Sequence, residues 1–164
     1  MVDVIIESGM GFVPDNAFHI EKSALYKNIG EGIRSVEFIR VKDESLLFVE
    51  ARKTFPNPNN ASAENLIKLQ LEITEICEKY LHSLNLFSAM KVGVTDYEFH
   101  KDFILPQKIT LVFVLVIKNH KPEWCRNIKS AIEAALPLYL KKIWKPKVFV
   151  INEITAVSRG LIVN

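Results

Sequence analysis

The sequence predicts an α/β fold, organised as one domain with a mixed central sheet flanked by helices. Residues 109–117 form an unbroken run of apolar and mostly β-branched or aromatic side chains, which is typical of a strand buried on both faces. Apolar residues recur at helical spacing across residues 62–90, and two strand-like runs flank a charged turn within residues 35–53. This order of strands and helices favours a layered α/β domain. A chain of 164 residues supports one full core, so we expect residues 1–164 to form a single domain.

The first third of the chain alternates short apolar runs with glycine and proline turn signals. We expect a strand near residues 2–7, an extended segment over residues 18–21 and a helical turn over residues 23–29. The hairpin of residues 35–53 follows. The proline-containing segment 55–60 then ends strand pairing, because proline has no backbone N–H to donate to a neighbouring strand.

Residues 62–90 are predicted to form one long amphipathic helix, with Ser62 as its N-cap and Glu64 in its first turn. Part of its apolar stripe repeats every seven residues, as shown by Leu66, Ile73, Tyr80 and Phe87. Packing against the sheet is the main role that we expect for this stripe. The heptad spacing also permits a second role, the seam of a homodimer. Such a seam needs a second apolar position in each heptad, and Ser83 interrupts that second series.

The segment 91–107 is polar and irregular. It carries four metal-ligand residue types at alternating positions, namely Asp96, Glu98, His100 and Asp102. On a strand these side chains would share one face and could hold a cation. A solvated loop or edge strand produces the same pattern more often.

Residues 109–117 should form the centre of the sheet. Pro122 then predicts the start of a second helix, because proline is favoured at the first helical position. Pro137 should kink that helix or divide it into two pieces. Residues 147–151 predict a further strand, whereas residues 153–163 show no clear period.

Composition narrows the class of protein without identifying its function. Apolar residues make up 49% and charged residues 24% of the chain, as in ordinary folded proteins. The net charge of +2 is too small to imply strong nonspecific attraction to nucleic acid. Cys77 and Cys125 lack metal-binding spacing, which favours buried free thiols in a reducing cytoplasm. The longest apolar run is far shorter than the roughly 20 residues of a membrane helix, so we expect a cytoplasmic protein without membrane association.

The predicted hairpin places carboxylates where apolar side chains belong. If it turns at residues 43–44, Glu37 stands opposite Glu50, with the Cβ atoms about 5 Å apart. Both lie on the face that carries the apolar side chains, and Arg52 lies diagonal to Glu37. Like charges opposed on a partly apolar face cost stability. Either a divalent cation or Arg52 is therefore expected to compensate their charge.

The residues Glu37 and Glu50-Ala51-Arg52 resemble the motif of the PD-(D/E)xK nuclease-like superfamily, whose members share the restriction-endonuclease fold. In that family an acid opens the second core strand and a D/E-x-K tripeptide closes the third, and a long helix and a buried strand follow. The resemblance implies that Glu37 and Glu50 bind Mg²⁺, that the substrate is DNA or RNA, and that Glu21 is the additional upstream acid found in many members.

Two positions depart from the family motif. Glu37 replaces an aspartate, and both residues offer oxygen ligands. Arg52 replaces the lysine, and a broad guanidinium fork does not reproduce a compact ammonium, although it still stabilises phosphate. Lys53 should point to the opposite face of its strand, whereas Lys68 on the long helix is a source for a relocated ammonium.

These departures leave three hypotheses open. The first is a nuclease-like fold that has lost catalysis because Arg52 stands at the lysine position. The second is an active Mg²⁺-dependent nuclease in which Glu21, Glu37, Glu50 and Arg52 form the catalytic site. The third is an unrelated α/β interaction module, in which the acids and Arg52 form only a salt-bridge cluster.

Overall fold

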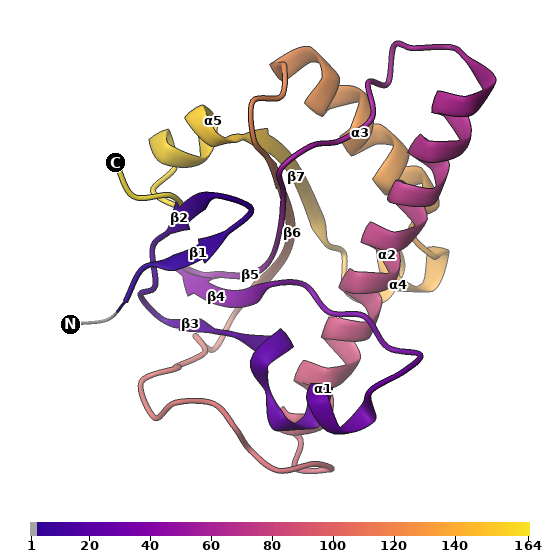
Figure 1. The fold of residues 1–164 in the computed structure, drawn as a ribbon. Coiled ribbons are helices and arrows are strands. Elements are labelled where there is room, and N and C mark those ends of the chain that lie inside the picture. The colour runs from indigo at the N-terminus through magenta and orange to yellow at the C-terminus, as the bar shows by residue number, and fades with distance from the viewer. Residues whose placement is uncertain (1–2) are drawn as a thin grey trace.

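The computed structural model describes residues 3–164. Five strands form a central sheet in the order β3-β4-β5-β6-β7 (Figure 1). β3, β4 and β5 pair antiparallel, whereas β5, β6 and β7 pair parallel. The strands span Ala17–Phe18 (β3), Phe38–Lys42 (β4), Ser45–Arg52 (β5), Thr110–Ile117 (β6) and Lys147–Asn152 (β7). The predicted α/β class and mixed sheet are confirmed.

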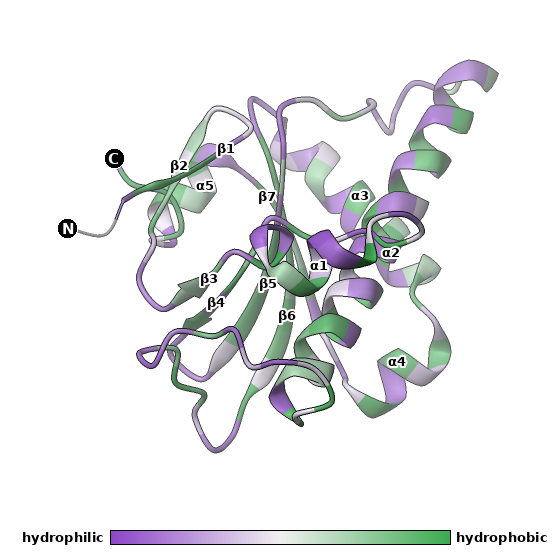
Figure 2. Ribbon diagram, turned by 60° about the horizontal axis from the view of Figure 1, so that its bottom comes forward, coloured by the Kyte–Doolittle hydropathy of each residue, from purple (hydrophilic) through white to green (hydrophobic). Residues whose placement is uncertain are grey.

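Both faces of this sheet are covered, and apolar colouring is concentrated on its strands (Figure 2). One face packs against the helices α1 (Ala24–Ile29), α2 (Ala63–Lys91), α3 (Pro122–Ala135) and α4 (Leu138–Ile143). The other face packs against a two-stranded hairpin and a short helix, namely β1 (Ile5–Glu7), β2 (Met10–Phe12) and α5 (Glu153–Ser158). A 3-10 helix, η1 (Ile20–Lys22), lies between β3 and α1.

The N-terminal elements differ from the prediction in detail. The strand expected near residues 2–7 contributes β1, which pairs with β2 in a separate sheet that the sequence pattern did not indicate. The helical turn predicted at residues 23–29 is confirmed as α1, whose N-cap Ser23 accepts a hydrogen bond from the Tyr26 N–H at 3.1 Å. The C-terminal segment without a clear period forms α5.

The predicted register of the β4–β5 hairpin is confirmed from Lys42–Ser45 to Phe38–Val49. Asp43 adopts φ +54° in the turn, a left-handed conformation that aspartate tolerates in tight hairpins. The regular ladder stops before Glu37, whose N–H donates to the Val49 carbonyl at 3.1 Å. Glu37 therefore precedes β4 and is not part of a regular strand pair with Glu50.

The apolar stripe of α2 packs on the sheet from its third turn onward. Ser62 caps the helix through its hydroxyl oxygen, which accepts the Asn65 N–H at 3.3 Å. Leu66, the first residue of the heptad series, is 48% exposed, whereas Tyr80 is completely buried. The Tyr80 ring stacks on Phe113 of β6 with a centroid separation of 4.4 Å. Sheet packing is thus confirmed as the main role of the stripe, and the homodimer seam stays a prediction.

Two further sequence features are explained by the fold. Pro137 separates α3 from α4, so the predicted division of this helix is confirmed. In the irregular segment 91–107, the Glu98 carboxylate accepts the backbone N–H groups of Ala24 and Leu25 at 2.6 and 3.0 Å. This segment therefore caps α1, and its four alternating polar residues do not converge as a metal-ligand group within residues 3–164.

Truncation of Phe113 tests this packing. Phe113→Ala should lower the free energy of unfolding by about 3–5 kcal/mol, because it leaves a cavity between β6 and α2. Urea unfolding followed by circular dichroism measures the change. Tyr139→Ala is a matched control, since that ring is 60% exposed, and it should change stability by less than about 0.5 kcal/mol. Equal losses in the two variants would contradict this placement of α2 and β6.

Candidate functional site

Three carboxylates from separate segments converge beside the central sheet. Glu7 ends β1, Glu21 lies in η1 and Glu37 precedes β4. One carboxylate oxygen from each lies within 4.8 Å of the other two. The structure thus brings Glu21 and Glu37 together and adds Glu7, which sequence reasoning missed. We call these three residues the acid cluster.

The turn after β1 is tied to the central sheet, which positions Glu7. The Ser8 hydroxyl donates to the Ala51 carbonyl at 3.1 Å, and the Lys118 ammonium donates to the Gly9 carbonyl at 3.0 Å. Ser8 and Gly9 both adopt positive φ, so the chain reverses tightly at this point. The N-terminal hairpin is thereby held against the ends of β5 and β6.

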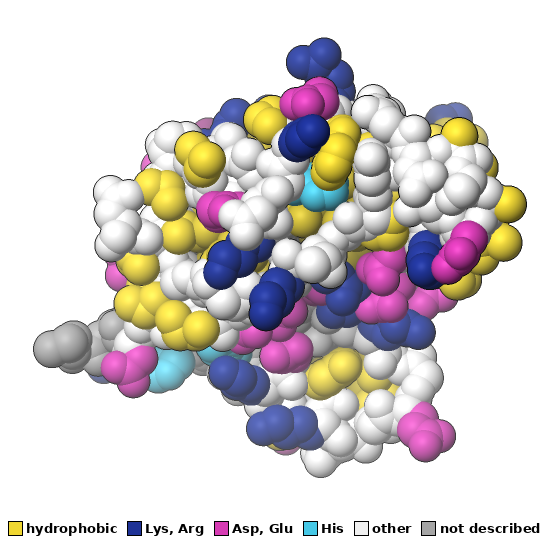
Figure 3. Space-filling model, turned by 45° about the horizontal axis from the view of Figure 1, so that its top comes forward, with side chains coloured by type: hydrophobic (Ala, Val, Ile, Leu, Met, Phe, Trp, Pro, Cys, Tyr) yellow, Lys and Arg dark blue, Asp and Glu magenta, His cyan; other side chains and the backbone are white. Residues whose placement is uncertain are grey.

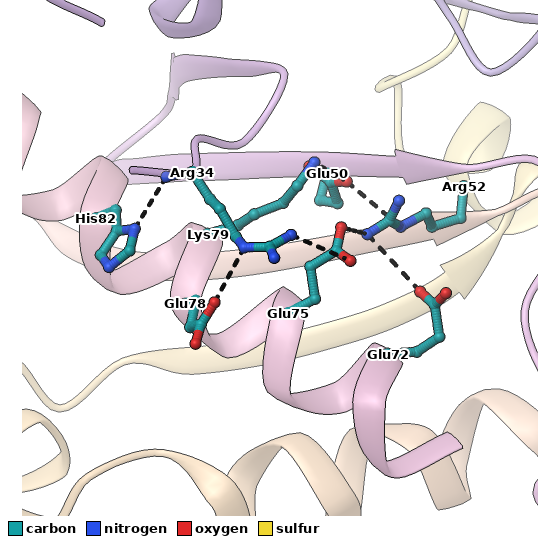
Figure 4. A network of polar contacts seen from close by, with 8 residues as sticks. All are labelled: Arg34, Glu50, Arg52, Glu72, Glu75, Glu78, Lys79 and His82. Atoms are coloured by element: carbon teal, nitrogen blue, oxygen red, sulfur yellow. Dashed lines mark hydrogen bonds and ion pairs between the residues drawn. The ribbon is translucent and has the colours of Figure 1, made fainter. Parts of the chain in front are cut away.

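Glu50 lies on β5, under α2, and is completely buried. Its Oε1 accepts a hydrogen bond from the Lys79 ammonium at 2.7 Å and lies 3.4 Å from Arg52 Nε (Figure 4). Its Oε2 has no hydrogen-bond partner within the part of the chain that the structure describes. One oxygen of this buried carboxylate is thus paired with two cations, and the other has no polar partner among the described residues.

Arg52 is directed mainly toward acids of α2. Its Nη2 donates to Glu75 at 2.7 Å and lies 3.7 Å from Glu72, as Figure 4 shows. Its contact with Glu50 is an ion pair without hydrogen-bond geometry. Lys79 is therefore the principal partner of Glu50, and Arg52, the partner expected from the sequence, is the secondary one.

The lysine of α2 that contacts Glu50 lies three turns beyond Lys68, the residue expected from the sequence. Lys68 is exposed and pairs with Glu64 at 2.8 Å. Lys79 comes from the buried half of the helix, immediately before Tyr80, and only 15% of its side chain is exposed. Eleven residues separate the two lysines, so they occupy the same side of α2.

The segment that carries Glu37 is anchored to the same helix. Arg34 lies 3.3 Å from Glu75 and 3.0 Å from Glu78, and its backbone N–H donates to His82 Nδ1 at 2.9 Å (Figure 4). These contacts fix the chain three residues before Glu37. The network in Figure 4 therefore connects β5, α2 and the segment before β4.

The surroundings of Glu37 and Glu7 raise the pKa of each carboxyl above its ordinary value. Burial, together with the charges of Glu50, Glu21 and Glu7, raises the pKa of Glu37 to about 8. Burial and the charge of Glu21 raise the pKa of Glu7. Burial also raises the pKa of Glu50, against the opposing effect of Lys79. A divalent cation would displace protons from such a cluster.

Two pockets open near the acid cluster, and Glu21 is the member of the cluster that lines one of them. One, of about 700 Å³, is lined by Glu21 and Lys79 together with Arg34 and His82. The other, of about 750 Å³, is lined by His19 and neighbouring residues of β1, η1 and the segment 91–107. Burial and the charge of Lys22 lower the pKa of His19, whose Nε2 lies 3.8 Å from Glu7 Oε1.

The residues present fit a hard divalent cation. Carboxylate oxygens are the ligands that Mg²⁺ and Mn²⁺ prefer. The acid cluster offers three such oxygens within 4.8 Å of one another. Glu50, a predicted metal ligand, lies outside this group, although its Oε2 is unpartnered in the described part of the chain. The chain can therefore supply both the ligands of a cation and an adjacent ammonium.

Neither a protein-family model, nor a curated protein, nor a solved structure matches the chain. Over residues 3–164, no helix combines the length and the apolar character needed to span a bilayer.

The raised pKa of Glu37 predicts how stability changes with pH in the absence of metal. Folded Glu37 keeps its proton up to about pH 8, whereas its ordinary pKa is 4.5. The folded protein thus binds more protons between these values, and stability falls as pH rises through the interval. Glu37→Gln mimics the protonated acid, so its free energy of unfolding should decrease less as pH rises. The difference from wild type should be about 1–2 kcal/mol, a figure that allows for the partial exposure of Glu37.

Urea unfolding at a series of pH values in EDTA measures this effect. Glu31→Gln, which removes an exposed glutamate in a turn, is the control and should leave the pH profile unchanged. A Glu37→Gln profile parallel to that of the wild type would show that Glu37 titrates normally.

The Lys79–Glu50 pair predicts a strong coupling. Lys79→Met should destabilise the protein by about 3 kcal/mol, because it leaves a buried carboxylate without its principal partner. Glu50→Gln combined with Lys79→Met should recover at least half of that loss, since the uncompensated charge is gone. A double-mutant cycle in EDTA measures the interaction, with Lys68→Met as the exposed control. Additive losses would contradict the pairing.

Proposed function

We propose that the protein is a metal-dependent nuclease with a PD-(D/E)xK-like fold, which hydrolyses phosphodiester bonds in DNA or RNA. The observation that supports this proposal best is the Lys79 ammonium, 2.7 Å from the buried Glu50 carboxylate. It offers the compact cation that Arg52 cannot offer at the motif position. The proposal thus favours an active enzyme over a fold that has lost catalysis.

In this proposal the acid cluster of Glu7, Glu21 and Glu37, together with the unpartnered Oε2 of Glu50, holds Mg²⁺ or Mn²⁺. The ion supplies charge neutralisation at the scissile phosphate and lowers the pKa of water. The Lys79 Nζ, which also borders the pocket that Glu21 lines, donates a hydrogen bond to a phosphate oxygen and stabilises the charge that develops there. Arg52 is a positioning residue, because its guanidinium links the end of β5 to Glu75 and Glu72 of α2.

The order of elements agrees with the resemblance. Glu37 directly precedes the β4–β5 hairpin and Glu50 lies on its second strand. The long helix α2 follows, and β6 lies between β5 and β7. Acidic and basic side chains lie interspersed on the face in Figure 3, so this face presents no broad basic surface of the kind that binds nucleic acid nonspecifically.

A second candidate is a binding or assembly module with the same fold and no chemistry. The contacts of Lys79 and Arg52 with Glu50 favour it, because two cations already offset the buried charge. In that case Glu50→Gln leaves partner binding intact and does not weaken the fold.

Cleavage assays separate the two candidates. Purified protein with Mn²⁺ or Mg²⁺ should cut plasmid or single-stranded oligonucleotides, and EDTA should abolish the activity. Glu50→Gln and Lys79→Met should each lower the rate by at least about 100-fold, since each removes charge stabilisation at the phosphate.

Lys68→Met is the matched control, because it removes a lysine from the same side of α2 without touching the site, and its rate should stay within about twofold of wild type. Thermal melts establish that each variant is folded at the assay temperature. If the folded wild-type protein cuts neither substrate with either ion, the binding module is the better explanation.

A further inference from the structure

We propose that the surface formed by α4 and the chain after it, residues 138–147, binds single-stranded nucleic acid, with lysines on the phosphates and aromatic rings on unpaired bases. We call it the α4 surface. The inference goes beyond the proposed function, because this binding needs neither a metal ion nor cleavage. Residues 138–147 line neither of the two pockets near the acid cluster. The α4 surface is thus distinct from the candidate site.

The α4 surface carries positive charge that the protein does not offset. No acidic residue occurs in the sequence between Glu133 and Glu153. The exposed lysines of this interval are Lys141, Lys142, Lys145 and Lys147. None of the four forms an ion pair within residues 3–164. Their charges are therefore complementary to those of a polyanion.

The helix dipole explains only part of this lysine group. Cations are favoured in the last turn of a helix, where Lys141 and Lys142 lie. Lys141 also has a local partner, since its ammonium donates to the Glu133 carbonyl at 3.0 Å. The dipole effect decreases beyond the last turn, so it does not account for Lys147, which begins the edge strand β7.

Two aromatic rings stand among these lysines. Tyr139 is 60% and Trp144 is 42% exposed, so each ring presents apolar surface to solvent. Tyr139 lies three residues before Lys142, and Trp144 lies directly between the end of α4 and Lys145. Rings interleaved with cations suit a single strand, because bases stack on the rings while phosphates meet the ammonium groups. Since stacking of this kind requires unpaired bases, we expect single strands to bind better than duplexes.

The pattern of α4 favours nucleic acid over an anionic lipid surface. Leu138 and Ile143 are also exposed, and a bilayer would accept such side chains. A helix that lies in a bilayer interface, however, separates its apolar face from its charged face. Lys142 follows Leu138 by four residues and Tyr139 by three, so it shares a side of the helix with both. Hydrophobic and hydrophilic colouring are accordingly mixed on α4 in Figure 2.

The α4 surface is held in place by the core. Leu140 is buried and belongs to the same apolar cluster as Tyr80 of α2. α4 and α2 therefore cover the same face of the sheet, and the exposed side chains of α4 project from a fixed helix. A surface ordered before binding loses less conformational entropy when it binds.

Binding of labelled oligothymidylate, about 16 nucleotides long, tests the inference by fluorescence anisotropy in EDTA, which prevents metal-dependent cleavage. The wild-type protein should bind with a dissociation constant of about 1–100 µM at physiological salt. A duplex of the same length should bind at least about tenfold more weakly. Four phosphate contacts should give a slope of about −3 for the logarithm of the binding constant against that of salt concentration.

Substitution of Tyr139 tests the stacking contact. Tyr139→Leu keeps an apolar side chain but removes the ring, and its affinity for oligothymidylate should fall by about 5- to 100-fold. Tyr139→Phe keeps the ring and is the matched control, so its affinity should stay within about twofold of wild type. Equal affinities in wild type and Tyr139→Leu would overturn the inference.

Substitution of lysines tests the phosphate contacts. The double variant Lys142→Gln and Lys147→Gln should make the salt slope shallower by about 1.4, since each phosphate contact on a single strand contributes about 0.7. Lys68→Gln combined with Lys101→Gln removes the same charge from exposed positions outside the α4 surface and should leave the slope unchanged. Identical slopes in the two double variants would contradict the assignment.

Two further measurements separate the alternatives. Co-sedimentation with phosphatidylserine vesicles tests the lipid alternative: if the vesicles bind the protein through Lys142 and Lys147 and oligothymidylate does not bind, the inference is overturned. Glu50→Gln should leave oligothymidylate affinity within about twofold of wild type, because Glu50 lies outside the α4 surface. Binding by a protein that cuts no nucleic acid supports the inference and counts against the nuclease proposal alone. Cleavage that is indifferent to both Tyr139→Leu and the lysine pair, without binding in EDTA, overturns the inference alone.

Discussion

The burial of a carboxylate between the sheet and its longest helix is the constraint on which the rest of this structure depends. Glu50 is completely buried on β5, and a charge in that position is tolerated only where a partner offsets its desolvation. Lys79 meets this need from α2 at 2.7 Å. The adjacent Tyr80 stacks on Phe113 of β6, so apolar packing fixes the rotation of the helix that delivers the ammonium. Core packing and the electrostatics of the candidate site are therefore inseparable.

The acid cluster is assembled by chain segments that are each fixed elsewhere. Arg34 ties the segment before β4 to α2, and Ser8 ties the N-terminal hairpin to β5. Glu98 caps α1, next to the 3-10 helix that carries Glu21. These anchors offset the repulsion among the carboxylates, which retained protons or a bound cation relieve further. Electrostatic repulsion within a small group of residues, offset by stabilising contacts around it, is characteristic of functional sites.

The sequence predicted the elements whose signals are local, and it identified two of the residues that matter most. Period, caps and proline positions located α2, the α3–α4 division and β6, because these depend on neighbouring residues alone. Glu37 and Glu50 were identifiable because they interrupt an apolar strand face. The ladder nevertheless ends at Phe38, so Glu37 meets Glu7 and Glu21 rather than standing in register with Glu50.

The sequence by itself determined the α/β class, the hairpin register from Lys42–Ser45 to Phe38–Val49, and the helix α2, which carries Lys68 and Lys79 on one side. Lys68 and Lys79 lie three turns apart on that side, and helical period does not distinguish one turn from another. Only the tertiary structure decided which lysine meets Glu50, because the position of α2 along the sheet is set by packing between distant segments. Glu7 joined the site for the same reason. Its proximity to Glu37 arises from contacts between segments far apart in the chain, which no local sequence pattern indicates.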